Sequence, residues 1–205
     1  MAEIRNLSGE LLYTSDGNKL DMDAFLDSDL PFADLRGLDL EASYIDNTNL
    51  AGADLSSASL YWSTLVDVNL EGANLTDANM QGVSLHNVNL KGANLRNVNL
   101  GPSNLGGSSV VHESDLSNAD LTGADMRGLN LVAANLKGAK LTQANLGPTD
   151  IGTPAVLFGS DFSGADLEGT DVREALFDEH TKFREGFDPI SHGMCFGRPS
   201  KKDSE

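Results

Sequence analysis

Side chains that could perform chemistry are scattered along this sequence. The four histidines, His86, His112, His180 and His192, lie far apart in the chain. The acid-acid-histidine run at 178–180 is three adjacent residues, which rarely converge on one metal ion. No loop of the form GxxxxGK[ST], which would cradle a phosphate, is present. We therefore expect no enzymatic activity, no cofactor and no bound metal.

A few aromatic residues are better suited to binding than to catalysis. Exposed tyrosine and tryptophan are enriched at interaction hot spots. Tyr44, Tyr61 and Trp62, together with His86, therefore form a candidate partner surface.

Acidic residues dominate the charge, with a formal net charge of −17 at pH 7. Residues 1–60 hold 12 acidic and 3 basic side chains, so the acidity is concentrated near the N-terminus. Such a field repels nucleic acid and attracts basic surfaces. We expect an unidentified protein partner and no direct binding of nucleic acid. The candidate acidic surface consists of Asp27, Asp29, Asp34, Asp39, Glu41, Asp46 and Asp54.

The single cysteine, Cys195, excludes a disulfide within the chain. The first residues, MAEIRNLSGELLYTSDG, lack the apolar core of a signal peptide. No stretch approaches the ~20 apolar residues that cross a membrane. These features predict a cytoplasmic protein that does not bind a membrane.

A period of five residues must position all of these side chains. A large apolar residue recurs at every fifth position from Phe25 to Val110, usually with a small residue two places before it. Leucines spaced by five would scatter around a helix and would alternate between the two faces of a flat strand. The pattern can be buried if the chain turns a corner at each pentapeptide, so that four corners close a square coil of about 20 residues.

The repeated units also resemble a known family. The segments ANLTDANM, KGANLRNVNL, SNADLTGADM and SGADLEGTD resemble the A(D/N)LXX units of pentapeptide-repeat proteins. The resemblance covers roughly 25–177 and implies an all-β fold, a right-handed quadrilateral parallel β-helix. We expect nearly eight coils, which makes a rod roughly 36 Å long at the usual strand spacing.

The residues before and after the array do not follow the five-residue period. We expect residues 1–24 to form an N-terminal β-hairpin cap, 25–177 the β-helix, and 178–205 a C-terminal cap and tail. The phase of the repeat moves by one residue at Val111 and again near Leu157, which we interpret as single-residue bulges at corners. This interpretation makes Leu105, Ile151 and Val156 central core residues and leaves the coils without inserted loops. Gly101-Pro102 and Gly147-Pro148 are interpreted only as turns.

Stacking at about 20 residues lets the outward columns be predicted. Asn49, Asn69 and Asn89 should form a hydrogen-bonded ladder, as should Asn74 and Asn94. Tyr61 and Trp62 should point outward, with Tyr44 near Trp62 and His86 on the same side as Tyr44.

Two functions fit these features. The first is a non-catalytic protein-interaction module or scaffold on a rigid β-helix. The second comes from the resemblance, because the Qnr and MfpA groups of the family resemble an acidic DNA duplex and bind DNA gyrase. Nearly neutral middle coils and the expected lack of inserted loops argue against such a DNA mimic. A homodimer through the C-terminal cap, whose apolar residues include Phe183, Phe187 and Phe196, is also possible.

Overall fold

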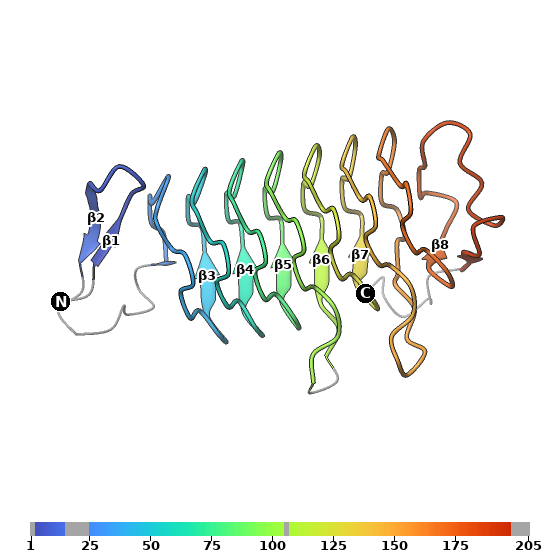
Figure 1. Cartoon of the computed structure of the whole chain (residues 1–205), viewed down its shortest axis with the longest axis horizontal. Helices are drawn as coiled ribbons and strands as arrows, with labels where there is room; N and C mark the ends of the chain where they lie inside the picture. Colours follow the sequence, from blue (N-terminus) through green and yellow to red (C-terminus); the bar gives the residue numbers. More distant parts are fainter. Residues whose placement is uncertain (1–2, 15–24, 105–106, 198–205) are drawn as a thin grey trace.

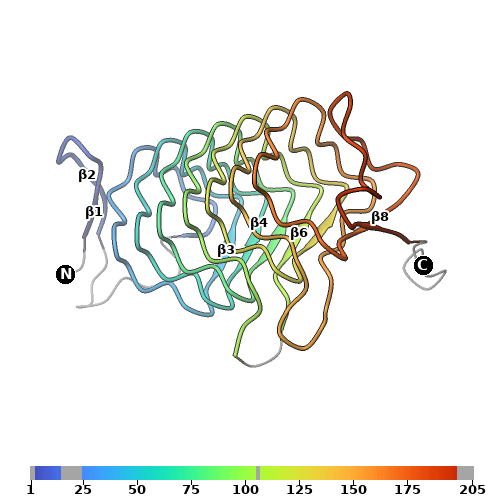
Figure 2. The same ribbon diagram turned by 45° about the vertical axis from the view of Figure 1, so that its right-hand side comes forward.

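The computed structural model describes residues 3–14, 25–104 and 107–197. These residues form a rod of stacked coils, with a hairpin at one end and an irregular segment at the other (Figure 1). Figure 2 shows the coils obliquely, as successive loops around one axis. The predicted all-β solenoid of about eight turns is confirmed. The strands are β1 (Glu3–Arg5), β2 (Leu11–Thr14), β3 (Tyr44–Asp46), β4 (Thr64–Val66), β5 (Ser84–His86), β6 (Val110–His112), β7 (Asn130–Val132), β8 (Leu176–Phe177) and β9 (Cys195–Phe196).

The coils stack in register on four sides. Strands β3 to β7 form one parallel five-stranded sheet. On the other three sides, isolated parallel bridges join residues twenty positions apart, for example Asp29 to Asn49 and Asp54 to Asn74. These four columns make the square cross-section that the five-residue period predicts.

The core contains one large and one small side chain for each pentapeptide. Leu75 and Ala73 are completely buried, and every central residue from Phe25 to Leu100 is buried in the same way. All of these residues belong to a single hydrophobic cluster that runs the length of the rod. Each coil therefore depends on its neighbours to cover its apolar side chains.

The corners impose a backbone constraint that the apolar period does not reveal. At a typical corner the Ala53 N–H donates to the Leu50 carbonyl at 3.0 Å, and Gly52 between them has a φ of 66°. A turn with positive φ at its third residue is a type II turn, which favours Gly or Asn at that position. Trp62 occupies the same kind of position with a φ of 57°.

The two predicted single-residue bulges are wrong, because each is a six-residue insertion. Leu85 pairs with Val111, a step of 26 residues instead of 20. Asn130 likewise bridges Val156, so that Leu157 takes the core position beside Leu131. The described extra residues lie in two outward loops. Loop 1 comprises residues 101–104 and 107–109, and loop 2 comprises residues 147–155. They project below the rod in Figure 1.

The core assignments at these loops change accordingly. Val111 and Leu157 are buried, whereas Val110 and Val156 are only half-buried and Ile151 is 87% exposed. Leu105 lies outside the described residues. An insertion of six and a shift of one leave the same phase in a period of five, so counting could not separate them.

The N-terminal hairpin covers the first coil. Strands β1 and β2 pair antiparallel, as the sequence predicts. The Arg5 carbonyl accepts a hydrogen bond from the Asp34 N–H at 2.7 Å, and Ile4 is buried against the core. Backbone groups of the open coil are thereby satisfied, which removes an exposed sheet edge. The predicted second turn at 16–18 lies outside the described residues.

The C-terminal segment covers the last coil with aromatic rings. Phe183 stacks on Phe162 with ring centroids 5.8 Å apart and lies 5.2 Å from the ring of Phe187. Phe183 and Phe187 thus cover their own coil. Phe196 in β9 is 54% exposed, and a homodimer through this cap stays a prediction.

The inward-outward pattern predicts unequal effects of neighbouring substitutions. Leu75→Ala should lower the free energy of unfolding by about 2–5 kcal/mol, because it leaves a cavity in a close-packed core. Thr76→Ala, at a half-buried outward position, should cost less than about 1 kcal/mol. Urea unfolding followed by circular dichroism measures both, and equal losses would contradict the square-coil packing.

An ion pair at the C-terminal end predicts a pH-dependent stability. Burial would raise the pKa of Asp161, but the hydrogen bond from Ser163 and the Lys137 ammonium outweigh it and hold the pKa at about 2. The Lys182 Nζ also lies 3.4 Å from the same carboxylate. A carboxyl whose folded pKa is depressed stabilises the fold above its ordinary pKa, and this contribution is lost as the pH falls through the folded pKa.

Asp161→Asn should therefore lower the free energy of unfolding by about 1–2 kcal/mol at pH 7. The difference between wild type and variant should narrow as the pH falls from about 4 to about 2. Urea titrations at several pH values measure it. A difference that does not change with pH would show that the carboxylate's charge is not the cause.

Candidate interaction surface

One side of the rod differs from the other three in its outward side chains. It carries strands β3 to β7, and we call it the strand face. Its outward positions alternate with the central core residues and include many apolar side chains. These positions are Leu26, Tyr44, Asp46, Thr64, Val66, Ser84, His86, Val110, His112, Asn130, Val132, Val156 and Phe158.

The other three sides are lined by polar ladders. The Asn69 side-chain amide donates to the Asn49 Oδ1 at 3.0 Å, and the Asn89 amide donates to the Asn69 Oδ1 at the same distance. The Asn69 oxygen also accepts from the Glu71 N–H at 3.1 Å. The predicted ladders are therefore confirmed, and their side chains are occupied by neighbours in the same molecule.

Several of the candidate acids begin these ladders. Asp27, Asp29 and Asp54 each accept a hydrogen bond from the asparagine one coil later. Asp34 accepts hydrogen bonds from Nε and Nη2 of Arg36, and this pairing lowers the pKa of the Asp34 carboxyl. Asp39, Glu41 and Asp46 lie on other sides or corners of the first coils. The candidate acidic surface therefore surrounds the rod instead of forming one face.

The predicted aromatic patch is divided. Tyr44 lies on β3, 51% exposed, and its hydroxyl donates to Asp46 at 3.3 Å. The Asp46 carboxylate raises the pKa of the Tyr44 phenol, which keeps the hydroxyl protonated. Trp62 contacts Tyr61 edge to face with ring centroids 6.5 Å apart, and no ring contact joins it to Tyr44 among the described residues.

Trp62 turns instead toward the following coils. A Cβ atom at Gly82 would lie 3.0 Å from Trp62 Nε1, and one at Gly107 would lie 2.8 Å from Trp62 Cζ2. The indole therefore crosses one glycine of the next coil and reaches loop 1. It remains 41% exposed, so it forms part of the corner beside the strand face.

His86 and His112 are neighbours, although the sequence separates them by 26 residues. They occupy the same register position on β5 and β6, and their ring centroids are 6.1 Å apart. His86 Nε2 lies 2.8 Å from the Ser84 hydroxyl, and His112 Nδ1 lies 4.0 Å from a Glu113 carboxylate oxygen. Sequence analysis missed this pair because loop 1 lies between the two strands. The described residues contain no group of three or more His, Cys, Asp or Glu placed to hold a metal.

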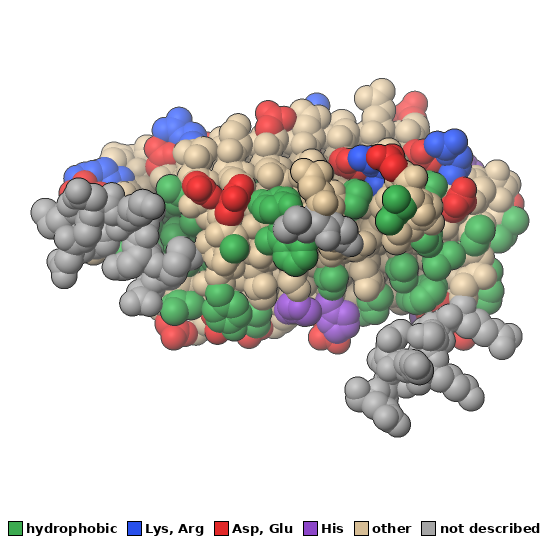
Figure 3. All heavy atoms as spheres, turned by 90° about the horizontal axis from the view of Figure 1, so that it is seen from below, with side chains coloured by type: hydrophobic (Ala, Val, Ile, Leu, Met, Phe, Trp, Pro, Cys, Tyr) green, Lys and Arg blue, Asp and Glu red, His purple; other side chains and the backbone are tan. Residues whose placement is uncertain are grey.

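Acids that pair with no described Lys or Arg border the strand face. Asp46 ends β3 and is an outward position of the face, and Asp67 and Glu113 follow β4 and β6 at the same edge. The outward positions of the strand face defined above include no Lys or Arg. At the opposite edge, Arg127 is bound by the carboxylates of Asp125 and Asp150. Figure 3 shows histidine, hydrophobic and acidic side chains together along the lower margin of this view.

The two loops leave the rod at equivalent corners and have the same backbone hydrogen-bond pattern. Ser103 N–H donates to the Gly107 carbonyl at 3.0 Å, and Thr149 N–H donates to the Thr153 carbonyl at 2.8 Å. The segments GPSNLGGSSVV and GPTDIGTPAVL match position by position. The Gly-Pro pairs thus open both loops, which goes beyond the turn role predicted for them.

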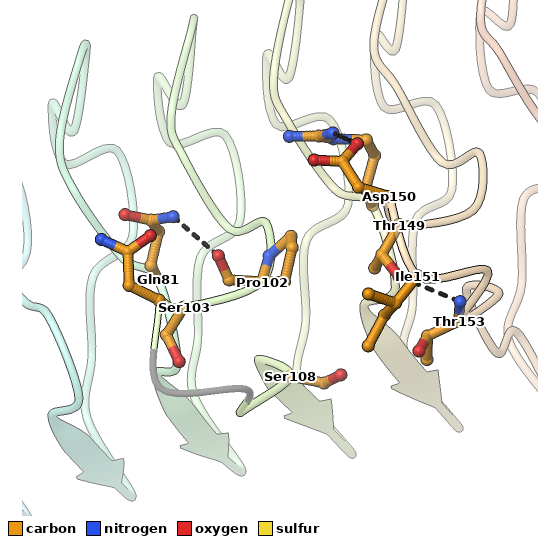
Figure 4. Close-up of a pocket in the computed structure, with 10 residues that line it drawn as sticks. Gln81, Pro102, Ser103, Ser108, Thr149, Asp150, Ile151 and Thr153 are labelled. Carbon is orange, nitrogen blue, oxygen red and sulfur yellow. Dashed lines mark hydrogen bonds and ion pairs between the residues drawn. The ribbon is translucent and has the colours of Figure 1, made fainter.

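A cleft of about 370 Å³ lies between the loops. Figure 4 shows Gln81 donating to the Pro102 carbonyl, at 2.7 Å, on the side of loop 1. On the other side, Arg127 Nη1 donates to Asp150 of loop 2 at 3.1 Å. These contacts tie each loop to a coil without an insertion, so the cleft is a fixed feature of this edge.

The repeat family is decided by a match over half of the chain. Eight copies of the unit described as pentapeptide repeats match residues 33–72, 63–101 and 112–147. The chain belongs to the pentapeptide-repeat family. The gap between the matches falls on loop 1, and the last match ends where loop 2 begins.

Several solved structures are similar to this chain, to different degrees. QnrB1, a plasmid-mediated fluoroquinolone resistance protein, aligns with a TM-score of 0.72 and 16% identity over 85% of this chain and 84% of its own. HetL, involved in heterocyst differentiation regulation in the cyanobacterium Nostoc, aligns at 0.46 and 28% over 78% and 82%. Rfr23 from the cyanobacterium Cyanothece aligns at 0.40 and 32% over 54% and 63%. A search of curated proteins gives no match.

The contact of loop 2 with Gly128 predicts that alanine is tolerated less well at this position than at a corner without such a contact. Gly128 has a φ of 63°, and a Cβ atom there would lie 2.5 Å from the Thr149 Cγ2 of loop 2. Gly72 has a φ of 66° with nothing within 4 Å of its Cβ position. Gly72→Ala should cost about 1 kcal/mol from backbone strain alone. Gly128→Ala should cost about 1 kcal/mol more because Thr149 must move.

Urea unfolding of both variants measures the difference, since the backbone strain is matched. Equal losses would mean that loop 2 does not press on this corner.

Proposed function

We propose that this protein is a non-catalytic interaction module whose strand face binds a partner protein. The observation that carries the proposal is the contrast between its sides. Two sides carry ladders that bond to themselves, as Asn49, Asn69 and Asn89 do. The third side carries polar outward residues such as Ser59 and Asn79. The strand face instead presents apolar side chains, and contiguous exposed apolar surface is typical of binding sites.

Rigidity supports the same function. The central residue of each strand, such as Leu65 or Leu85, is fully buried in a continuous core. Outward neighbours such as Val66 and His86 are thus held on a fixed frame. A preorganised surface loses little conformational entropy on binding, which favours affinity.

The cleft supports a recognition role better than catalysis. Its polar groups include Ser103, Thr149 and Arg127, but Arg127 is already paired with two carboxylates. No cleft residue is a histidine or cysteine that could activate or serve as a nucleophile.

The second candidate function is an acidic DNA mimic that binds a DNA-binding protein such as DNA gyrase. The fold shared with QnrB1 and the acidic first coils support it, and the two loops remove the objection that the coils lack insertions. The middle coils nevertheless carry neutral asparagine ladders where a duplex mimic needs continuous charge. The interaction module therefore explains more of the surface.

Site-specific crosslinking in the cells that produce the protein tests the proposal. A photoreactive amino acid at Thr64 or Val132, on the strand face, should give covalent adducts with the same protein partner. The same group at Thr76 or Thr122, on other sides of the rod, should give none. Mass spectrometry identifies the adducts.

Adducts of equal yield from all four positions, or none from the strand face, would contradict the proposal. A supercoiling assay with DNA gyrase separates the alternative, because inhibition at low micromolar protein would favour the DNA mimic.

A further inference from the structure

We infer that the strand face binds a segment of another protein whose contact surface alternates apolar and basic side chains. This inference rests on the proposed function and names the chemistry of the partner. It follows from the apolar columns of the face, from the acids at its border, and from where the basic residues of the rod lie.

The apolar side chains of the strand face lie in two columns, one on each side of the central core residues. Val66, Val132 and Phe158 follow the central residues of their strands, and Val110 and Val156 precede theirs. All five are half-buried, so each exposes part of an apolar side chain beside its neighbours. Val132 and Phe158 are neighbours in one column, at the strand spacing of about 4.8 Å. His86 and His112 lie between Val66 and Val132, and Asn130 lies between Val110 and Val156, so the apolar columns are interrupted.

The negative charge of the strand face comes from Asp46, Asp67 and Glu113 at one of its edges, which we call the border. Asp67 and Glu113 are exposed and lie two coils apart, and Asp46 is half-buried one coil before Asp67. Asp67 accepts one hydrogen bond from Asn87 at 2.5 Å, which uses one carboxylate oxygen and leaves the charge in place. Acids beside an apolar strip attract a basic partner and repel acidic ones.

The basic residues of the described coils lie elsewhere. Arg36, Lys91, Arg96 and Lys137 each pair with a carboxylate away from the strand face. Among the described residues, no Lys or Arg therefore pairs with the acids of the border. A partner with basic side chains would supply these positive charges.

A second copy of this chain would not satisfy the border. Two strand faces in contact with their rods antiparallel would bring the acids Asp46, Asp67 and Glu113 of both copies to the same edge. With the rods parallel, the acids would meet the opposite edge, where Arg127 is already paired with carboxylates of its own chain. Juxtaposed like charges oppose association. The electrostatics thus favour a different protein with basic side chains.

The test compares two variants with the same change in net charge. The border variant is Asp46→Asn, Asp67→Asn, Glu113→Gln. The control variant, Asp39→Asn, Asp77→Asn, Glu168→Gln, removes three exposed acids on other sides. Asp77 is a close match for Asp67, because it accepts a ladder hydrogen bond from Asn97 at 3.0 Å.

The probes are two fluorescent synthetic peptides, one alternating lysine and valine and one alternating glutamate and valine. Fluorescence anisotropy of the labelled peptides measures binding. We expect the lysine–valine peptide to bind. The border variant should weaken binding about tenfold, from three charge pairs lost, and the control variant less than about threefold.

A third variant tests the contribution of the apolar side chains to peptide binding. Val66→Thr, Val132→Thr keeps the shape and the strand preference of both side chains and should weaken binding of the same peptide severalfold. Circular dichroism and thermal unfolding confirm that each variant is folded.

Several results would overturn the inference. Equal loss in both acid variants would mean attraction by net charge alone, and preference for the glutamate–valine peptide would mean the opposite chemistry. Self-association lost in the valine variant would mean that a second copy covers the face. Failure of the lysine–valine peptide to bind, while strand-face crosslinks to a partner still form, would reject the basic character of the partner but not the proposed function.

Discussion

The packing of one large and one small side chain inside every pentapeptide is the constraint on which this structure depends. Identical coils can stack only if the large residues of successive coils, such as Leu55 and Leu75, meet at the same place. Stacking then brings backbone groups into register on all four sides. The same repetition brings side chains of one type above one another, so a favourable outward pair in one coil is favourable in the next.

Much of this architecture could be predicted from the sequence, because core positions repeat in phase. The four sides and the ladders follow from that phase, whereas the hairpin is predicted from the turn residues that precede the array. The loops could not be predicted, because six extra residues leave the phase of a five-residue period unchanged from a shift of one. Ile151 illustrates the limit: it is apolar and in phase, yet it lies at 87% exposure in loop 2.

The same error hid part of the candidate site. Once loop 1 is known to contain six extra residues, His112 falls beside His86 and Val110 beside Ser84. The orientation of Trp62 was hidden for another reason. It depends on the space that Gly82 and Gly107 leave free in neighbouring coils, and the central-residue pattern carries no information about that space.

The sides of the rod differ in chemical character because stacking affects each type of outward side chain differently. A column of Asn can bond to itself, since its amide donates to the coil before and its oxygen accepts from its own corner. A column of Val or His cannot saturate itself in this way. Both loops leave the rod at the corner that precedes the strand face, and Trp62 and Arg127 lie along the same edge. An insertion at a corner keeps the coils in register. Because both insertions lie at the corner before the strand face, the two loops project along the edge of the side that exposes apolar side chains.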